Sequence, residues 1–372
     1  MKIALLLSFV WLSCSCQAQN FYLFTGTYTG TGSKGIYVYR FDASTGKAIH
    51  VSNTDTCVNP SYVAASYGGK YIYAVNETNG TNPGSVSSYA FNKNTGKLKF
   101  LNNQVTGGDD PCYVTISRDD QWMIVGNYSG GNLSVFRLNK NGTINHYTQL
   151  VQDTGSSINE TRQEKAHVHS TVLSPDEKYL FTPDLGTDKV MVYAFNKEHT
   201  RPLKPYSPAY VTTVAGSGPR HFTFHPDHHF AYLVNELSGT VSSFTYLNGH
   251  LEKMEEMATH PAEYKGLPGS ADIHTSPDGK FLYVSNRGDE NTITIFSISN
   301  SGRLRLLGFQ PTMGRTPRNF VIDPTGTFLL VANQDTDNIV IFRRNKKTGG
   351  LKYTGRQLKV PKPVCLQMIP AK

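Results

Sequence analysis

The stretch GPRHFTFHPDHHFAYLVNE, residues 218–236, decides the fold of this chain. It contains an apolar strand, a tight turn at Pro226 and Asp227, a second apolar strand and a polar exit at Asn235 and Glu236. Alternating apolar and polar residues rich in aromatic and β-branched types are typical of β-strands, and Pro-Asp favours a reversal between them. The stretch therefore predicts two adjacent antiparallel strands.

The same pattern occurs in five further copies that align without gaps. They begin at Asn59, Asp110, His167, Gly269 and Thr316. Each copy continues into a third alternating strand, such as TVSSFTY, and a weaker fourth strand, and equivalent residues recur every 46 to 57 residues. This is the period of a large propeller blade. Each repeat is predicted to be a four-stranded antiparallel blade, with strands a, b, c and d from the channel outward.

The two ends of the repeat array supply one more blade. NFYLFTGT (20–27), GIYVYRF and KAIHVS correspond to strands b, c and d, and KPVCLQMI (362–369) corresponds to strand a. Pairing these segments closes the ring and removes two exposed sheet edges. The sequence therefore predicts an all-β fold, a seven-bladed β-propeller over residues 20–372.

Residues 1–18 have the features of a secretory signal. Lys2 precedes an apolar run over residues 3–12, and Cys16 and Ala18 place small residues at the −3 and −1 positions of a cleavage site. The run is too short to span a bilayer, so we expect an exported protein, periplasmic or secreted, without a membrane span. A second interpretation is a lipoprotein with a lipid anchor at Cys14 or Cys16.

Composition limits the partners of the protein. The net charge is +8, but no basic run is long enough for a nucleic-acid surface, so we expect small anionic ligands, no nucleic acid and a monomer. Cys57, Cys112 and Cys365 lack metal-ligand spacing and are expected to be packed thiols. His221, His225, His228 and His229 resemble a metal cluster. The turn histidines nevertheless fall on the opposite face from Arg220, so we expect no metal and no cofactor.

Repeat arithmetic locates a candidate site. The first residue of strand a and the residue just past strand b lie at the same mouth of a propeller channel. Residues with a structural role in a repeat protein should resemble one another from blade to blade. At these positions, however, consecutive blades carry five charged or titratable residues that break the pattern: His169, Arg220, Glu236, Arg287 and Arg318. The structural alternative is an inter-blade salt bridge from Glu236 to Arg220 or Arg287. Further candidates for substrate contact are Gln334, Glu77, Tyr128 and Asp184. The polar insert 151–165 lies over this mouth as a lid or a surface loop.

Several of these segments resemble the propeller-type lactonases. The segments are GPRHFTFHPDHHFAYLVNELSGTV, ADIHTSPDGKFLYVSNR, HSTVLSPDEKYLF and TPRNFVIDPTG. That family includes bacterial 6-phosphogluconolactonases and the fungal carboxy-muconate lactonizing enzyme. The resemblance covers essentially all of the chain after the signal and implies a metal-independent site formed by His169, Arg220, Arg287 and Glu236. Relatives that act on 6-phosphogluconolactone work in the cytoplasm, whereas this chain carries an export signal.

Lactone hydrolysis assigns a role to each candidate. It needs a base for water, donors for the oxyanion and an acid for the leaving alkoxide. We expect His169 or Glu236 to transfer protons, Arg220 and Arg287 to polarise the carbonyl or clamp an anion, and Arg318 to hold an anionic end. The expected function is a carboxylic ester hydrolase acting on a sugar or sugar-acid lactone. A muconate-type cycloisomerase and a non-catalytic anion- or saccharide-binding propeller remain as alternatives.

Overall fold

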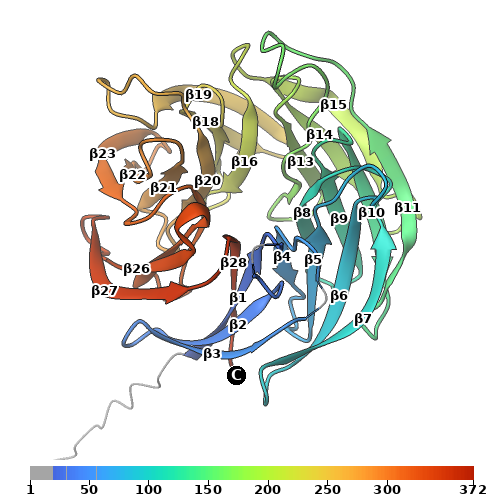
Figure 1. Ribbon diagram of the computed structural model, residues 1–372. Helices are drawn as coiled ribbons and strands as arrows, with labels where there is room; N and C mark the ends of the chain where they lie inside the picture. Colours follow the sequence, from blue (N-terminus) through green and yellow to red (C-terminus); the bar gives the residue numbers. More distant parts are fainter. Residues whose placement is uncertain (1–19, 31, 56) are drawn as a thin grey trace, which may run out of the picture.

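The computed structural model describes residues 20–30, 32–55 and 57–372, so the predicted signal and the candidate anchors Cys14 and Cys16 lie outside the described residues. Its strands form seven four-stranded antiparallel sheets arranged as blades around a central axis (Figure 1). The prediction of a seven-bladed β-propeller is confirmed.

Six blades each use four consecutive strands, and we number them I to VI in chain order. Blade I consists of β4 (Val63–Ala65), β5 (Tyr71–Asn76), β6 (Ser85–Asn92) and β7 (Lys97–Val105). Blade II consists of β8 (Pro111–Ile116), β9 (Trp122–Asn127), β10 (Asn132–Leu138) and β11 (Ile144–Gln152). Blade III consists of β12 (Val172–Leu173), β13 (Tyr179–Asp184), β14 (Lys189–Phe195) and β15 (Leu203–Thr212).

The second half of the ring repeats this arrangement. Blade IV consists of β16 (Pro219–Phe224), β17 (Phe230–Asn235), β18 (Thr240–Leu247) and β19 (His250–Ala258). Blade V consists of β20 (Ser270–Thr275), β21 (Phe281–Asn286), β22 (Thr292–Ile298) and β23 (Leu304–Pro311). Blade VI consists of β24 (Pro317–Ile322), β25 (Phe328–Asn333), β26 (Asn338–Arg344) and β27 (Leu351–Lys359), with the short 3-10 helix η1 (Gln334–Thr336) after β25.

The closing blade joins the two ends of the described chain. It contains β1 (Asn20–Thr27), β2 (Tyr37–Asp42), β3 (Lys47–Asn53) and β28 (Pro363–Pro370), in the order β28-β1-β2-β3. β28 pairs antiparallel with β1, from Phe21 opposite Pro370 to Thr27 opposite Pro363, and occupies the innermost position (Figure 1). The predicted closure is therefore confirmed, and no inner strand position of the ring is left empty among the described residues.

The reversal between strands a and b is the same in six blades. One residue in each turn has a positive φ, and its N–H bonds to the carbonyl three residues earlier; these residues are Gly69, Asp120, Glu177, His228, Gly279 and Gly326. Glycine, aspartate and histidine tolerate this left-handed conformation better than β-branched residues. The turns keep strands a and b in a fixed register, which places the ends of b at one mouth of the channel.

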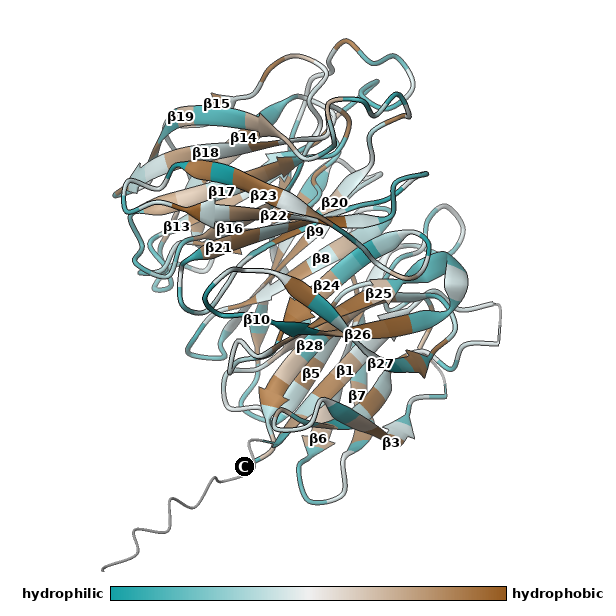
Figure 2. Cartoon of the chain, turned by 90° about the vertical axis from the view of Figure 1, so that its left-hand side faces the viewer, coloured by the Kyte–Doolittle hydropathy of each residue, from teal (hydrophilic) through white to brown (hydrophobic). Residues whose placement is uncertain are grey.

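The apolar cores lie between adjacent blades. Seven hydrophobic clusters each join two neighbouring sheets, for example Phe181 and Phe222 between blades III and IV, with stacked rings 5.4 Å apart. Figure 2 shows apolar residues concentrated along the strands and polar residues on many of the connecting loops. Sheet-on-sheet packing of this kind fixes the angle between blades, and it holds the channel rigid.

A polar hub centred on Asp272 lies beside the candidate site, where the ring of His221 is 5.4 Å from that of His169. The carboxylate of Asp272 on β20 accepts hydrogen bonds from His221 Nδ1 (2.7 Å), His274 Nε2 (3.0 Å) and Asn319 Nδ2 (2.5 Å). It also accepts from the backbone N–H groups of Ile273 (3.0 Å) and Phe320 (3.2 Å). These groups belong to blades IV, V and VI, so one buried carboxylate joins three blades at the axis.

The structure also bears on the cysteines, on membrane-spanning helices and on metal sites. Cys57, Cys112 and Cys365 are free and buried, as predicted. No helix within the described ranges is long and apolar enough to cross a membrane. In the same ranges, no group of three or more His, Cys, Asp or Glu side chains is arranged to hold a metal ion.

Candidate active site

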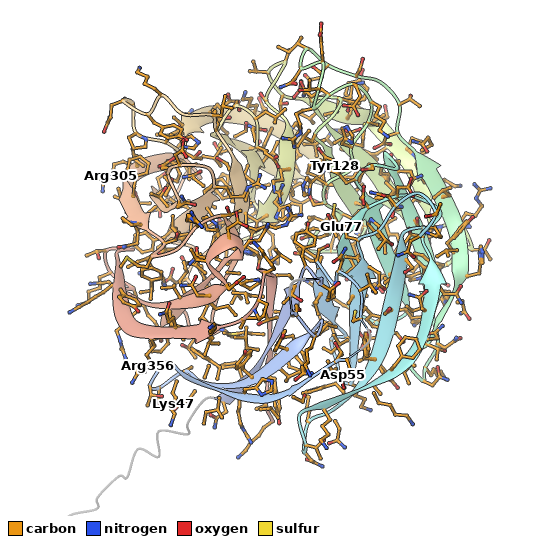
Figure 3. The ribbon with its side chains drawn as sticks, in the orientation of Figure 1. Lys47, Asp55, Glu77, Tyr128, Arg305 and Arg356 are labelled. Carbon is orange, nitrogen blue, oxygen red and sulfur yellow. The ribbon has the colours of Figure 1, made fainter. Side chains whose placement is uncertain are left out.

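A charged pocket lies at one mouth of the channel. It has a volume of about 310 Å³ and is lined by Glu77, Cys112, Tyr128, Arg162, His169, Arg220, Glu236, Arg287 and Arg318. Figure 3 shows Glu77 and Tyr128 on the inner side of the ring, whereas Arg305, Arg356 and Lys47 lie at its outer edge. A volume of this size accommodates a small polar ligand.

The backbone places the exit residues of the b strands at this mouth. In six repeats the N–H of the exit residue donates to the carbonyl of the residue that opens the repeat, as in Glu236 to Gly218 (2.7 Å) and Arg287 to Gly269 (3.1 Å). The repeat therefore fixes the backbone position of each exit residue, and the residue type determines the chemistry of its side chain. This geometry explains why an alignment of the repeats located the pocket.

Glu236 lies at the centre of the pocket and is 5% exposed. Its Oε2 contacts Arg220 Nη1 at close range and Arg287 Nη2 at 3.1 Å, and its Oε1 accepts from Arg162 Nη2 at 2.7 Å. Burial alone would raise the pKa of Glu236, but the positive charges of Arg287 and Arg220 outweigh it and hold the pKa well below its usual range. Glu236 is therefore ionised, and its proton affinity is low.

Arg220 and Arg287 are each held by two contacts. Arg220 donates from Nε to the carbonyl of Ala271 (2.8 Å), and Arg287 donates from Nε to the carbonyl of Gly269 (3.0 Å). The predicted ion pairs with Glu236 exist, so the structural alternative describes part of the arrangement. Within the described residues, Nη2 of Arg220 and Nη1 of Arg287 make no hydrogen bond, so each arginine keeps one donor for a ligand.

His169 is a buried, neutral base beside Glu236. Its Nε2 lies 4.0 Å from Glu236 Oε2, and its Nδ1 lies 3.7 Å from Cys112 Sγ. The ring also makes edge contacts with Tyr128 and His221, with centroids 5.2 and 5.4 Å away. Burial, followed by the charge of Arg220, holds the pKa of His169 well below 6.5. The imidazole is therefore unprotonated at neutral pH and can accept a proton.

The other half of the pocket is built around Arg318. Its guanidinium lies over the ring of Tyr28, 5.4 Å from the centroid, and its Nη2 lies 3.8 Å from Glu77 Oε2. Glu77 Oε1 accepts from the hydroxyl of Tyr28 (2.8 Å), but the buried Oε2 has no hydrogen-bond partner in the part of the chain that the structure describes. A separation of 3.8 Å is too long for a hydrogen bond, so this half of the pocket keeps an unused acceptor and unused donors.

Two predicted contact residues do not line the pocket. Gln334 begins the helix η1, and its Nε2 donates to Asp335 Oδ1 at 3.4 Å. Asp184 is fully buried, and its Oδ1 accepts from the N–H groups of His167 (2.7 Å) and Gly186 (2.9 Å). It occupies the position that is Asn in the other repeats and fixes the turn after β13.

Three residues around the pocket were not predicted as site residues: Arg162, Cys112 and Tyr28. Arg162 lies in the insert 151–165, and the extra length of that repeat was its one signal in the sequence. Cys112 occupies the first position of strand a, but burial, followed by the charge of Glu77, raises the pKa of its thiol, so it is a weak nucleophile. Tyr28 follows strand b of the closing blade and supports Glu77.

The fold and the pocket define a seven-bladed β-propeller whose channel mouth holds a base, two carboxylates and four arginines. Comparison with known protein families assigns this propeller to one family. Residues 22–368 match the family described as lactonase, 7-bladed β-propeller, and the chain belongs to that family.

Similar proteins cover nearly the whole chain. A 6-phosphogluconolactonase of Formosa agariphila is 40% identical over 93% of this chain and 99% of its own, and one of Bacillus subtilis is 33% identical over 93% and 97%. The structure of the periplasmic gluconolactonase of Pseudomonas aeruginosa superposes with a TM-score of 0.90 at 37% identity, covering 95% of this chain and 100% of that one. A structure from Bacteroides fragilis gives a TM-score of 0.91 at 39% identity over 95% and 99%.

Proposed function

We propose that this protein hydrolyses the lactone of a sugar or sugar acid to the open hydroxy acid. The observation that carries the proposal is the neutral His169 next to Glu236, with Arg220 and Arg287 each keeping a free terminal donor. A site built only to bind anions has no use for a buried neutral base beside an ionised carboxylate. The names of the relatives from Formosa agariphila and Bacillus subtilis support the same reaction.

His169 is the better candidate for the base. Three arginines occupy the oxygens of Glu236, and its lowered pKa makes it a poor proton acceptor. His169 is unprotonated and carries no strong hydrogen bond at Nε2, where Glu236 lies 4.0 Å away. Glu236 then stabilises the imidazolium that forms when His169 takes up a proton, and it holds the arginines in place.

The reaction uses these groups in two steps. The oxygen of a water molecule attacks the lactone carbonyl carbon while His169 accepts a proton from that water. The carbonyl oxygen becomes an oxyanion, which the free donors of Arg220 and Arg287 stabilise. Collapse of the tetrahedral intermediate breaks the bond to the ring oxygen, which receives the proton from His169. The product is a hydroxy acid, whose carboxyl group releases its own proton to solvent.

Lactone turnover and its dependence on His169 test this proposal. Acid release from glucono-δ-lactone and 6-phosphoglucono-δ-lactone is measured in a pH-stat with wild type, His169→Ala and His199→Ala. We expect His169→Ala to lower kcat about 10²- to 10⁴-fold, because general acid–base catalysis is lost. The exposed His199 is the matched control and should leave kcat unchanged. Unchanged turnover in His169→Ala contradicts the assignment of the base.

Two further readouts separate hydrolysis from its alternatives. In ¹⁸O-labelled water a hydrolase adds one labelled oxygen to the product, whereas a cycloisomerase gives a product with the mass of its substrate. A protein that turns over no lactone, but binds sugar acids in a manner that depends on Arg220, is an anion-binding propeller. Arg305→Ala, at the outer edge of the ring in Figure 3, is the control for Arg220→Ala.

We also propose that the protein acts outside the cytoplasm. The apolar run over residues 3–12 and the small residues at Cys16 and Ala18 support an exported form, and so does the similarity to a periplasmic gluconolactonase. Cell fractionation of a tagged chain, with and without residues 1–18, tests it. Retention of the full chain in the cytoplasm contradicts export, and metabolic labelling with a fatty acid identifies the lipid-anchored form.

A further inference from the structure

We infer that Arg162 recognises an anionic substituent of the substrate at the rim of the pocket, while the lactone ring lies deeper. This inference rests on the proposed function, because it specifies a chemical group of the substrate that binds in the same pocket. It concerns a phosphate or carboxylate group that the substrate carries in addition to the lactone. The contacts of Arg162, its loop and the opposite half of the pocket each support it.

The insert 151–165 holds Arg162 firmly. Gln163, next to it, is fully buried; its Nε2 donates to the carbonyl of Leu185 (2.8 Å), and its Oε1 accepts from the N–H of Asn159 (3.2 Å). The N–H of Gln163 also donates to the carbonyl of Asn159 (2.7 Å), which closes a tight turn. The insert is therefore an anchored support that places one guanidinium over the pocket, in contrast to an unanchored surface loop.

Within the described part of the chain, one nitrogen of the Arg162 guanidinium makes hydrogen bonds. Nη2 donates both to Glu236 Oε1 (2.7 Å) and to the hydroxyl of Tyr128 (3.2 Å). Among the described residues, Nε and Nη1 of Arg162 make no hydrogen bond, so their N–H groups are free to donate to the oxygens of a phosphate or carboxylate. Its side chain is 43% exposed, compared with 2% for Arg220 and 18% for Arg287. Arg162 is therefore the most accessible cation of these three.

The other arginines are less suited to an added anion. Arg220 and Arg287 are paired with Glu236, and their free donors serve the lactone carbonyl in the proposed reaction. Arg318 has unused donors, but Glu77 Oε2 lies 3.8 Å from it and would repel a phosphate placed there. Arg318 and the unpartnered Glu77 Oε2 suit sugar hydroxyls, which both donate and accept. This assignment replaces the expectation that Arg318 holds an anionic end.

Binding of matched sugar acids tests the inference. Titration calorimetry measures the Kd of gluconate, 6-phosphogluconate and glucarate. Compared with gluconate, 6-phosphogluconate carries an added phosphate, and glucarate carries a second carboxylate. The variants are Arg162→Gln, Arg162→Lys and, as the control, Lys165→Gln. Lys165 is an exposed cation of the same insert that donates to the carbonyl of Ser129 outside the pocket.

We expect Arg162→Gln to weaken binding of 6-phosphogluconate, glucarate or both about 10- to 100-fold, and binding of gluconate less than about 3-fold. Arg162→Lys should recover part of the loss, because the charge returns without the several N–H donors of the guanidinium. A loss confined to 6-phosphogluconate identifies phosphate as the group, and a loss confined to glucarate identifies carboxylate. Equal losses for all three ligands, or no loss for any of them, overturn the inference.

Turnover separates this inference from the proposed function. If the wild type hydrolyses lactones, Arg162→Gln should raise KM for 6-phosphoglucono-δ-lactone by a larger factor than KM for glucono-δ-lactone, whereas Lys165→Gln should change neither KM. If the wild type hydrolyses neither lactone, the proposed function fails, and the Kd values still decide whether Arg162 selects the anion. Circular dichroism melting shows that each variant keeps its ring.

Discussion

Replacement of Asp272 by Asn should weaken the ring at its centre. In the wild type, Oδ1 of Asp272 accepts from His221 and Ile273, and Oδ2 accepts from His274, Asn319 and Phe320. Asparagine keeps the shape of the side chain but replaces one acceptor with an NH₂ donor. Whichever oxygen is replaced, at least two donors from the surrounding blades then face another donor.

The expected cost follows from these contacts. Each buried donor left without an acceptor costs about 1–3 kcal/mol, and removal of one partner from a buried ion pair costs about 3–5 kcal/mol in total. Burial alone would lower the pKa of His274, but the carboxylate of Asp272 outweighs it and raises the pKa, so the lost charge matters as well. We expect a loss of about 4 kcal/mol. With an unfolding entropy of about 2.1 cal/mol/K per residue over about 350 residues, Tm falls by about 5 °C.

Urea unfolding and thermal melting at pH 7 measure this loss, with Asp55→Asn as the control. Asp55 is exposed, and its substitution should change the unfolding free energy by less than about 0.5 kcal/mol. The favourable charge of Asp272 is fully present above its unfolded pKa of about 3.9 and is lost as pH falls through its lower folded pKa. Because Asp272 also raises the folded pKa of His274, the difference should be largest between about pH 5 and pH 6.5 and should decrease as pH rises through that raised pKa. A loss below about 1 kcal/mol for Asp272→Asn would refute the hub as a source of stability.

Three other predictions follow from the same contacts. Glu236→Gln leaves the buried Arg220 without its counter-charge, so we expect a loss of about 3–5 kcal/mol in urea unfolding and at least about 10²-fold in kcat; wild-type values for both would contradict its central position. Burial lowers the pKa of His221 to about 4 and that of His169 well below 6.5, so the unfolded chain binds more protons between those values. The unfolding free energy should therefore be fully retained above pH 6.5 and fall below it, for His221 by about 1.4 kcal/mol per pH unit down to its folded pKa of about 4, and His221→Gln should flatten the curve. Deletion of residues 363–370 removes β28 and leaves β1 without its inner neighbour, so the truncated chain should lose cooperative melting and bind a hydrophobic dye; a sharp melt near the wild-type Tm would count against ring closure as a requirement.

Sequence repeats predicted the parts of the molecule that the backbone fixes. The strands, the closing blade and the positions of His169, Arg220, Glu236 and Arg287 all depend on a regular register, which the alignment of repeats reproduces. The exit residues occupy equivalent places because their N–H groups make the same backbone hydrogen bond in each repeat. Regular backbone geometry therefore transfers from one blade to the next.

Features outside the regular register could not be predicted in this way. Arg162 belongs to an insert with no counterpart in other repeats, and its side chain reaches Glu236, 74 residues further along the chain. Gln334 was expected at the pocket, and its N–H makes the same backbone bond as the other exit residues, but its side-chain amide bonds to the adjacent Asp335. The Asp184 side chain is used for a turn, because its Oδ1 accepts from the N–H of Gly186. Tyr28 becomes relevant only through its contact with Glu77 across two blades.

The distribution of the pocket residues among blades bears on how such a protein evolves. Glu77, Cys112, His169, Arg220, Arg287 and Arg318 come from blades I to VI in turn, and Tyr28 comes from the closing blade. Recombination between similar repeats readily adds or removes one blade, and the resulting chain could still close as a ring with six or eight sheets. Such a ring would change the angle between every pair of neighbours and separate Glu236 from its arginines. Selection on the chemistry of one mouth thus preserves the number of repeats in the gene.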